Sequence, residues 1–352
     1  MRELHISKQD IRTTRFVDVA PAPLAAGAAR LKIDLFALTS NNVTYAAMGE
    51  GMLGYWDFFP APEGFGKVPV WGFATVLESN ARDINVGSRF YGYYPLAETL
   101  DVTPRKTATG FIDTAPHRAA KAVLYNVYTD VTADPVYDAN FEPEQTLFRP
   151  LYGTGWWAAD CVQHAHARSV VLSSASSKTA LATAHQLRNL GGVEVIGLTS
   201  PGNAEYVRES GLYHRTVLYA DAGALDVQAP VTFVDFLGRA ELTATVHRTL
   251  GAKLTRSIII GVTDWAASRG APTEPLSGPK PEFFFVPTYA AERLKTDPQL
   301  GPVMQRDLRN FYPASHAFVA VQRLTGADAI QAAWSRLAAG DVPPREGLVL
   351  SF

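Results

Sequence analysis

The sequence predicts an α/β protein in which a doubly wound parallel sheet follows a β-rich first part, and three observations predict it. Residues 31–96 are short β-type runs separated by turns, and beyond Pro150 apolar strands alternate with helices. Residues 170–182 (VVLSSASSKTALA) form a buried strand, a tight turn of small residues and a helix start. α/β proteins bind the phosphates of nucleotides at such a turn.

The first part of the chain contains the signals of short strands. Residues 31–38 alternate, and residues 68–77 are apolar and rich in β-type side chains. Asn85 and Gly87 then mark a turn before a further strand. A small barrel-like domain is the natural closure for such strands.

Strands and helices alternate in the second part. Strands are expected at residues 169–173, 193–198, 216–219, 231–236, 257–261 and 283–286. Helices are expected at residues 156–162, 177–190 and 203–210. The last segment, with strands at 317–321 and 347–350 and a helix at 327–339, is expected to fold back onto the first domain.

Composition excludes several classes of function. The 352 residues are 47% hydrophobic and 19% charged, which is a globular composition. With 32 basic and 34 acidic side chains and no basic run, nucleic acid is not an expected partner. The single cysteine, Cys161, forms no internal disulfide, and no apolar stretch is long enough to span a membrane. We therefore expect a cytoplasmic protein that acts on small molecules, and a homodimer is left open.

The order of these parts resembles the medium-chain dehydrogenase/reductase superfamily, in a divergent subfamily of its zinc-independent quinone oxidoreductase and enoyl reductase branch. Matching phrases lie at residues 38–45 (LTSNNVTY), 70–76 (VWGFATV), 86–92 (VGSRFYG), 151–156 (LYGTGW) and 347–350 (GLVL). The resemblance implies a GroES-like catalytic domain over residues 1–125 and a Rossmann-type cofactor-binding domain over residues 126–300. Residues 301–352 would return to the catalytic domain. A fold resemblance gives no substrate.

By the same resemblance, the turn after residue 172 would hold a cofactor pyrophosphate. Glycines normally allow that approach, whereas serines and a lysine stand here. Their hydroxyls and the ammonium group can still bind phosphate oxygens. The expected pyrophosphate-binding residues are Thr154, Ser174, Ser176, Ser177, Lys178 and Thr179. The alternative is a serine-capped helix with a solvated lysine. A triphosphate loop is not supported, because Leu172 and Ser177 occupy its glycine positions.

The second strand indicates which nicotinamide cofactor binds. An NAD site usually has a carboxylate after this strand, whereas Thr199 and Ser200 stand here, which favours NADP(H). Thr199 and Ser200, and less directly Tyr213 or Arg208, are candidates for the 2′-phosphate; solvated residues at a helix start are the alternative. The pairs Leu237 with Gly238 and Gly261 with Val262, at the ends of later strands, are expected beside the nicotinamide ribose.

No metal site and no hydrolase site are expected. The cysteine and Gly-His-Glu ligands of the zinc-dependent branch are missing, and His164 with His166 is expected at the surface. No Gly-x-Ser-x-Gly elbow occurs at a strand end.

Hydride transfer without metal needs a hydrogen-bond donor to the acceptor oxygen and a source of protons. Tyr45 is the first candidate, by its place in the family's turn, and Asn42 could orient a carbonyl or the cofactor amide. Tyr55, in the aromatic segment 54–59, could line the site of a flat acceptor. The alternatives are a tyrosine packed at a domain edge, ordinary turn chemistry and core packing.

Together these features predict a zinc-independent, NADPH-dependent reductase of an activated carbonyl compound, an enone or a quinone. The alternatives are direct reduction of a ketone or aldehyde and a non-catalytic nucleotide-binding protein.

Overall fold

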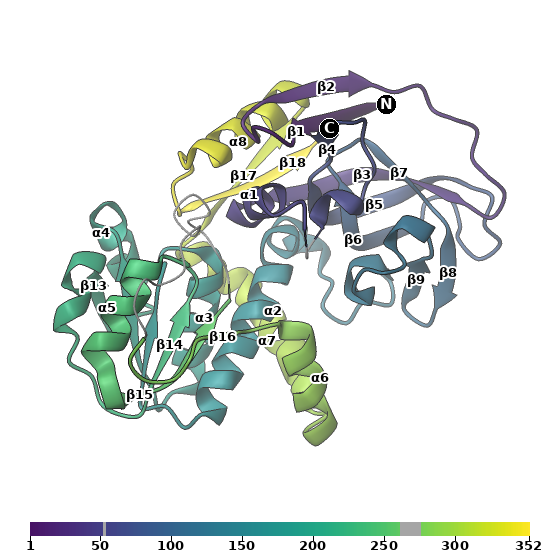
Figure 1. The fold of residues 1–352 in the computed structure, drawn as a ribbon. Coiled ribbons are helices and arrows are strands. Elements are labelled where there is room, and N and C mark those ends of the chain that lie inside the picture. The colour runs from purple at the N-terminus through teal and green to yellow at the C-terminus, as the bar shows by residue number, and fades with distance from the viewer. Residues whose placement is uncertain (52–53, 261–275) are drawn as a thin grey trace. The chain divides into compact units, whose positions relative to one another are not determined.

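The computed structural model describes residues 1–51, 54–260 and 276–352, and the chain divides into two compact units (Figure 1). The first contains residues 1–147 and 319–352, and the second contains residues 148–318. The boundaries expected from the sequence lie earlier, near residues 125 and 300. The first boundary lies inside helix α2 (Glu142–His164), which carries the chain from one unit into the other.

The first unit is built on two β-sheets. In the larger one, order β17-β18-β3-β5-β6-β10-β9-β8 with β7 beside β3, all pairs are antiparallel except β17 with β18. Its strands are β3 (Ala29–Leu38), β5 (Pro69–Ser79), β6 (Arg89–Pro95), β7 (Thr99–Val102), β8 (Pro104–Thr107), β9 (Gly110–Asp113), β10 (Val127–Asp130), β17 (Ala320–Thr325) and β18 (Glu346–Ser351). The smaller sheet contains β1 (Arg2–Ser7), β2 (Thr14–Asp18) and β4 (Phe65–Gly66). Helices α1 (Ser40–Ala47) and α8 (Ala327–Ala339) belong to the same unit.

The second unit is a parallel sheet of the doubly wound type. Its order is β13-β12-β11-β14-β15-β16, so that in chain order the strands read 3-2-1-4-5-6. The strands are β11 (Ser169–Leu172), β12 (Glu194–Thr199), β13 (Arg215–Leu218), β14 (Val231–Asp235), β15 (Leu254–Ile259) and β16 (Glu282–Phe283). The helices of this unit, besides most of α2, are α3 (Lys178–Leu190), α4 (Ala204–Glu209), α5 (Ala240–Leu250), α6 (Val286–Thr296) and α7 (Leu300–Ala314). The strand order reverses between β11 and β14, where ligands of such folds bind.

The predicted fold class is confirmed, and the differences are local. Helix α2 starts at Glu142 rather than near residue 156 and passes through Pro150, because buried neighbours such as Tyr152 outweigh the lost hydrogen bond. The strand expected at 283–286 is only the two-residue β16, since Val286 begins α6 with proline in its first turn. The asparagine pair expected in a turn lies in α1, whose start is capped by Thr39.

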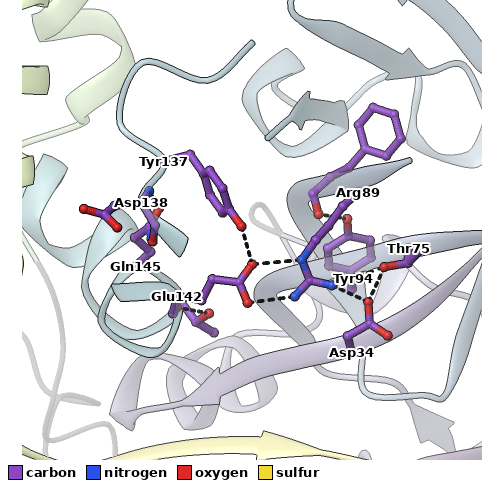
Figure 2. Close-up of polar contacts among 10 residues, drawn as sticks. Asp34, Thr75, Arg89, Tyr94, Tyr137, Asp138, Glu142 and Gln145 are labelled. Atoms are coloured by element: carbon purple, nitrogen blue, oxygen red, sulfur yellow. Dashed lines mark hydrogen bonds and ion pairs between the residues drawn. The ribbon is translucent and has the colours of Figure 1, made fainter. Parts of the chain in front are cut away.

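A charged network ties three strands of the first unit to the start of α2 (Figure 2). Arg89 makes two 2.9 Å bonds to the Glu142 carboxylate and a 2.5 Å bond to Asp34 Oδ2. Thr75 donates to the same oxygen of Asp34 at 2.6 Å, and the Tyr137 hydroxyl donates to Glu142 at 2.9 Å. Burial alone would lower the pKa of Arg89, but the two carboxylates outweigh burial and raise it.

We predict that Arg89→Met destabilises the protein by about 2 kcal/mol, because two largely buried carboxylates lose their shared cation. Arg89→Lys, which keeps the charge but not the two-pronged geometry, should lose about half as much. Urea unfolding monitored by tryptophan fluorescence measures both. Equal stability of the methionine variant and the parent protein would contradict the importance of this network.

Candidate functional site

The turn between β11 and α3 has the conformation of a phosphate-binding turn although it lacks glycine. Ser174 adopts a positive φ of 48°, a conformation that glycine adopts without strain. Ser177 is the N-cap of α3, and its hydroxyl accepts from the Ala180 amide at 3.3 Å. The first amides of α3 therefore point out of the helix start, as anion binding requires.

Two side chains, from the segments after β12 and before β13, hold this turn in place. The Tyr213 hydroxyl donates to the Ala175 carbonyl at 2.7 Å, and the Asn203 amide donates to the Ser176 hydroxyl at 3.1 Å. Burial raises the pKa of Tyr213 well above its usual value, so the phenol keeps its proton. Gly197 is needed beneath the turn, since a Cβ there would come within 2.8 Å of Ala175 and Tyr213 atoms. Tyr213, a candidate for the 2′-phosphate, thus uses its hydroxyl to support the turn.

A buried hydrogen-bond network joins the ends of β11 and β14. The Ser173 hydroxyl donates to Asp235 Oδ1 at 2.6 Å and accepts from the Phe236 and Leu237 amides. The same carboxylate accepts from the amides of Leu237 and Gly238 and from the Thr243 hydroxyl at 2.9, 3.0 and 2.9 Å. The side chains of Ser173 and Asp235 are both buried. The network fixes the loop after β14 at the point where the strand order reverses.

Asp235 is not among the residues that the sequence predicts for the site. Its signal is an acidic residue that ends an otherwise apolar strand, VTFVD, and that signal does not reveal its partners. The amides of Leu237 and Gly238, two residues predicted beside the nicotinamide ribose, are donors to Asp235. Gly261 and Val262, predicted there too, lie outside the described residues.

Thr199 and Ser200 lie where the sequence places them, at the carboxyl end of β12. Thr199 is fully buried and its hydroxyl has no hydrogen-bond partner, whereas Ser200 is half-buried and continues in an extended conformation. Arg208 lies in the last turn of α4. Ser200 and Pro201 directly follow β12, so the carboxylate that an NAD site usually has at this position is absent.

Thr154 lies inside α2, not at a helix start. Its hydroxyl donates to the Pro150 carbonyl at 3.1 Å, one turn earlier in the helix. Gly155 beside it allows close helix packing, since a Cβ there would lie 2.8 Å from the Thr183 amide nitrogen of α3. Thr179 lies in the first turn of α3 and Lys178 is its first residue.

These residues fit a phosphorylated dinucleotide. A small-residue turn precedes a helix at the reversal of strand order, Ser174 in that turn adopts a glycine-like conformation, and the strand beside it ends without an acid. The buried, unpartnered hydroxyl of Thr199 lies at the same end of the sheet.

In the first unit, Asn42 serves the start of α1. Its carbonyl oxygen accepts from the Thr39 amide at 2.7 Å, and its amide group donates to the Pro69 carbonyl at 2.8 Å. Together with the Thr39 hydroxyl this is a capping box. Local chain chemistry, the alternative weighed in the sequence analysis, accounts for these contacts.

Tyr45 and Tyr55 belong to one aromatic cluster of the first unit. Their rings stack with centroids 4.4 Å apart, over a buried core of Phe58, Phe59 and Tyr93. Trp71 and Tyr125 also pack against this core. Burial, followed by the neighbouring phenols, raises the pKa of Tyr45 well above its usual value. Tyr45 is therefore a neutral hydrogen-bond donor at physiological pH.

The segment that carries Tyr55 is held by two basic residues. Lys121 donates to the Gly54 carbonyl at 2.9 Å and to Asp57 at 2.8 Å, and the His117 ring bonds the Phe58 carbonyl at 3.2 Å. Trp56, Phe58 and Phe59 are buried, so the core alternative holds for them, while Tyr55 remains half-buried.

Two further observations concern metal and membrane. Over residues 1–51, 54–260 and 276–352, no group of three or more His, Cys, Asp or Glu side chains could hold a metal ion, and His164 and His166 are exposed. Among the helices that the structure describes, none has the length and apolarity to cross a membrane.

The fold is that of known oxidoreductases. The chain superposes on E. coli K-12 YhdH with bound NADPH (TM-score 0.61, 14% identity, 99% of each chain covered). It also superposes on CurA from Vibrio vulnificus in complex with NADPH (0.60, 11%, 100% and 99% covered) and on the CurK enoyl reductase (0.57, 13%, 99% and 98%). At these identities the likeness shows the fold alone, and it confirms the fold that the resemblance implied.

The sequence itself matches one family model over residues 36–343, described as "Protein of unknown function (DUF2855)". The chain belongs to this family. A comparison with curated proteins found no match.

We predict that Asp235→Ala destabilises the protein by about 3 kcal/mol, because two hydroxyls and two amides lose a buried acceptor. Asp235→Asn is the matched control and should cost about 1 kcal/mol. Its oxygen can keep the Ser173 and amide bonds, and its NH₂ can donate to Thr243, whose hydroxyl can still donate to the Arg239 carbonyl. Urea unfolding and hydrogen exchange at the Leu237 and Gly238 amides measure the effect. Equal behaviour of both variants would show that the network is not held by the carboxylate.

Proposed function

We propose that this protein is a zinc-independent, NADPH-dependent oxidoreductase that reduces an activated carbonyl compound, an enone or a quinone. The observation that carries the proposal is the serine-rich turn at residues 173–177, which leads into α3 at the reversal of strand order. The printed titles of solved structures with this fold support it, since E. coli YhdH and CurA were crystallised with NADPH and CurK is an enoyl reductase.

In this proposal the second unit binds the cofactor. The amides at the start of α3, the hydroxyls of Ser176 and Ser177 and the Lys178 ammonium take the pyrophosphate. Thr179 and Thr154 lie on the two helices next to this turn. Thr199 and Ser200 take the place of the carboxylate that an NAD site has, and a 2′-phosphate is accepted there without repulsion.

The first unit supplies the group that polarises the acceptor. NADPH, when bound, supplies the hydride, which forms the new C–H bond and leaves NADP⁺. Tyr45 donates a hydrogen bond to the acceptor oxygen as negative charge develops there, and solvent completes the reduction with a proton. The Tyr55 ring stacked on Tyr45 offers a flat aromatic surface to the acceptor.

Two other functions give different products. Direct reduction of a ketone or aldehyde yields an alcohol, whereas conjugate reduction leaves the carbonyl in the product, so mass spectrometry of enone products separates them. The other function is that of a nucleotide-binding protein without turnover. The absence of glycine from the turn between β11 and α3 favours it. Such a protein would bind NADPH, but NADPH would not be oxidised in the presence of any compound from a broad panel of acceptors.

We predict that Ser177→Asp weakens NADPH binding at least about tenfold, because a carboxylate then faces the pyrophosphate. Aspartate caps helices as well as serine does, so α3 should remain intact. Ser177→Asn, a neutral cap, is the control and should bind within about threefold of the parent protein. Titration of NADPH fluorescence measures both. If aspartate and asparagine behave alike, the pyrophosphate does not lie at this turn.

We predict that Tyr45→Phe lowers kcat by about 100-fold and leaves NADPH affinity unchanged, since only the hydrogen bond to the acceptor is lost. Because the pKa of Tyr45 is raised, its proton is present across the range of about pH 6 to 9 and contributes no step to the pH profile there. Tyr55→Phe is the control, with a similar ring and a much smaller effect. Full activity of the Tyr45 variant would remove this residue from the chemistry.

A further inference from the structure

Arg239, an arginine of the second unit that the sequence did not single out, lies over an aromatic ring that follows β13. Arg239 is the N-cap of α5 and follows Gly238 at the end of the β14 loop. Its guanidinium carbon lies 5.9 Å from the centroid of the Tyr219 ring, an arrangement of the cation–π type. Both side chains are half-buried, so a ligand can reach them from solvent while the surrounding protein limits their motion.

The strand register places this pair next to the end of β12. Thr199 pairs with Leu218, so Tyr219, the next residue after β13, follows the strand that lies beside Ser200. Leu198 belongs to the core under α5, and Val217 and Tyr219 pack against that same core. Because side chains alternate along extended chain, Ser200 belongs to the same face of the sheet as Tyr219. Arg239, Tyr219 and Ser200 therefore gather at one end and on one face of the sheet.

The chemistry of this group matches a phosphomonoester on a nucleoside. A guanidinium binds phosphate oxygens with two parallel hydrogen bonds, and its charge is permanent. The Ser200 hydroxyl can donate a further hydrogen bond, and the Tyr219 ring is an aromatic neighbour of the guanidinium. Asp235 in turn fixes the loop that carries Arg239, through the Thr243 hydroxyl, which also contacts the Arg239 carbonyl at 3.2 Å.

We propose that Arg239, held against Tyr219, binds the 2′-phosphate of the adenine ribose and makes the second unit select NADPH over NADH. This assignment rests on the proposed cofactor-binding function and adds the residue that determines specificity. Thr199 and Ser200 explain why a phosphate is tolerated, whereas Arg239 explains why it would be preferred.

The test is calorimetric titration of the full chain with NADPH and with NADH, for the parent protein and for Arg239→Gln. We expect the substitution to weaken NADPH binding about 10- to 100-fold and to leave NADH within about threefold. Arg239→Lys should retain an intermediate preference. Arg248→Ala, in the last turn of the same helix and exposed, is the control and should leave both affinities unchanged.

A second measurement does not depend on how well the Arg239 variants fold. Ser200→Glu leaves the arginine in place but adds a carboxylate beside it, and should reduce the preference for NADPH over NADH at least about tenfold. In the parent protein, adenosine 2′,5′-bisphosphate should bind more tightly than adenosine 5′-monophosphate.

The outcomes separate this inference from the proposed function. If Arg239→Gln weakens both cofactors equally, or neither, the assignment of Arg239 is overturned while cofactor binding stands. An unchanged cofactor preference in Ser200→Glu also overturns it. If the parent protein binds neither cofactor, the proposed function fails and this inference fails with it.

Discussion

The hydrogen bond between Ser173 and Asp235 is the constraint on which the candidate site depends. It joins the ends of β11 and β14, on either side of the strand-order reversal, at the end of the sheet where ligands of doubly wound folds bind. One carboxylate accepts from two hydroxyls and two backbone amides, so the loop after β14 has little freedom. The turn after β11 is fixed from the other side by Tyr213 and Asn203. A turn without glycine thus keeps a single conformation because its neighbours hold it.

Different residues are proposed to bind the cofactor phosphates and the acceptor. Backbone amides and small hydroxyls surround the start of α3, a lysine adds charge there, and Arg239 lies over the Tyr219 ring that follows β13. The first unit contributes buried phenols whose raised pKa values keep them neutral donors. The groups proposed for cofactor binding in the second unit include a charged lysine, whereas the proposed hydrogen-bond donor of the first unit is a neutral phenol.

The sequence was sufficient for features that depend on local pattern. Apolar runs and small-residue turns predicted β11, β12 and α3 to within a residue or two, and the helix at 327–339 was predicted with its bounds. Features that depend on distant partners were missed. Asp235 and Arg239 contact residues that are distant in the sequence, and α2 continues through Pro150 because burial outweighs the local effect of proline. Asn42 was read as turn chemistry or catalysis, and its capping partner Thr39 was not identified.

The central claim is that the serine-rich turn binds a phosphorylated nicotinamide cofactor. The most direct test is titration of the full chain with NADPH and NADH, followed by the cofactor's fluorescence and by calorimetry. The account predicts saturable one-to-one binding of NADPH and at least about tenfold weaker binding of NADH. Absence of binding for both cofactors, or tighter binding of NADH, would contradict it.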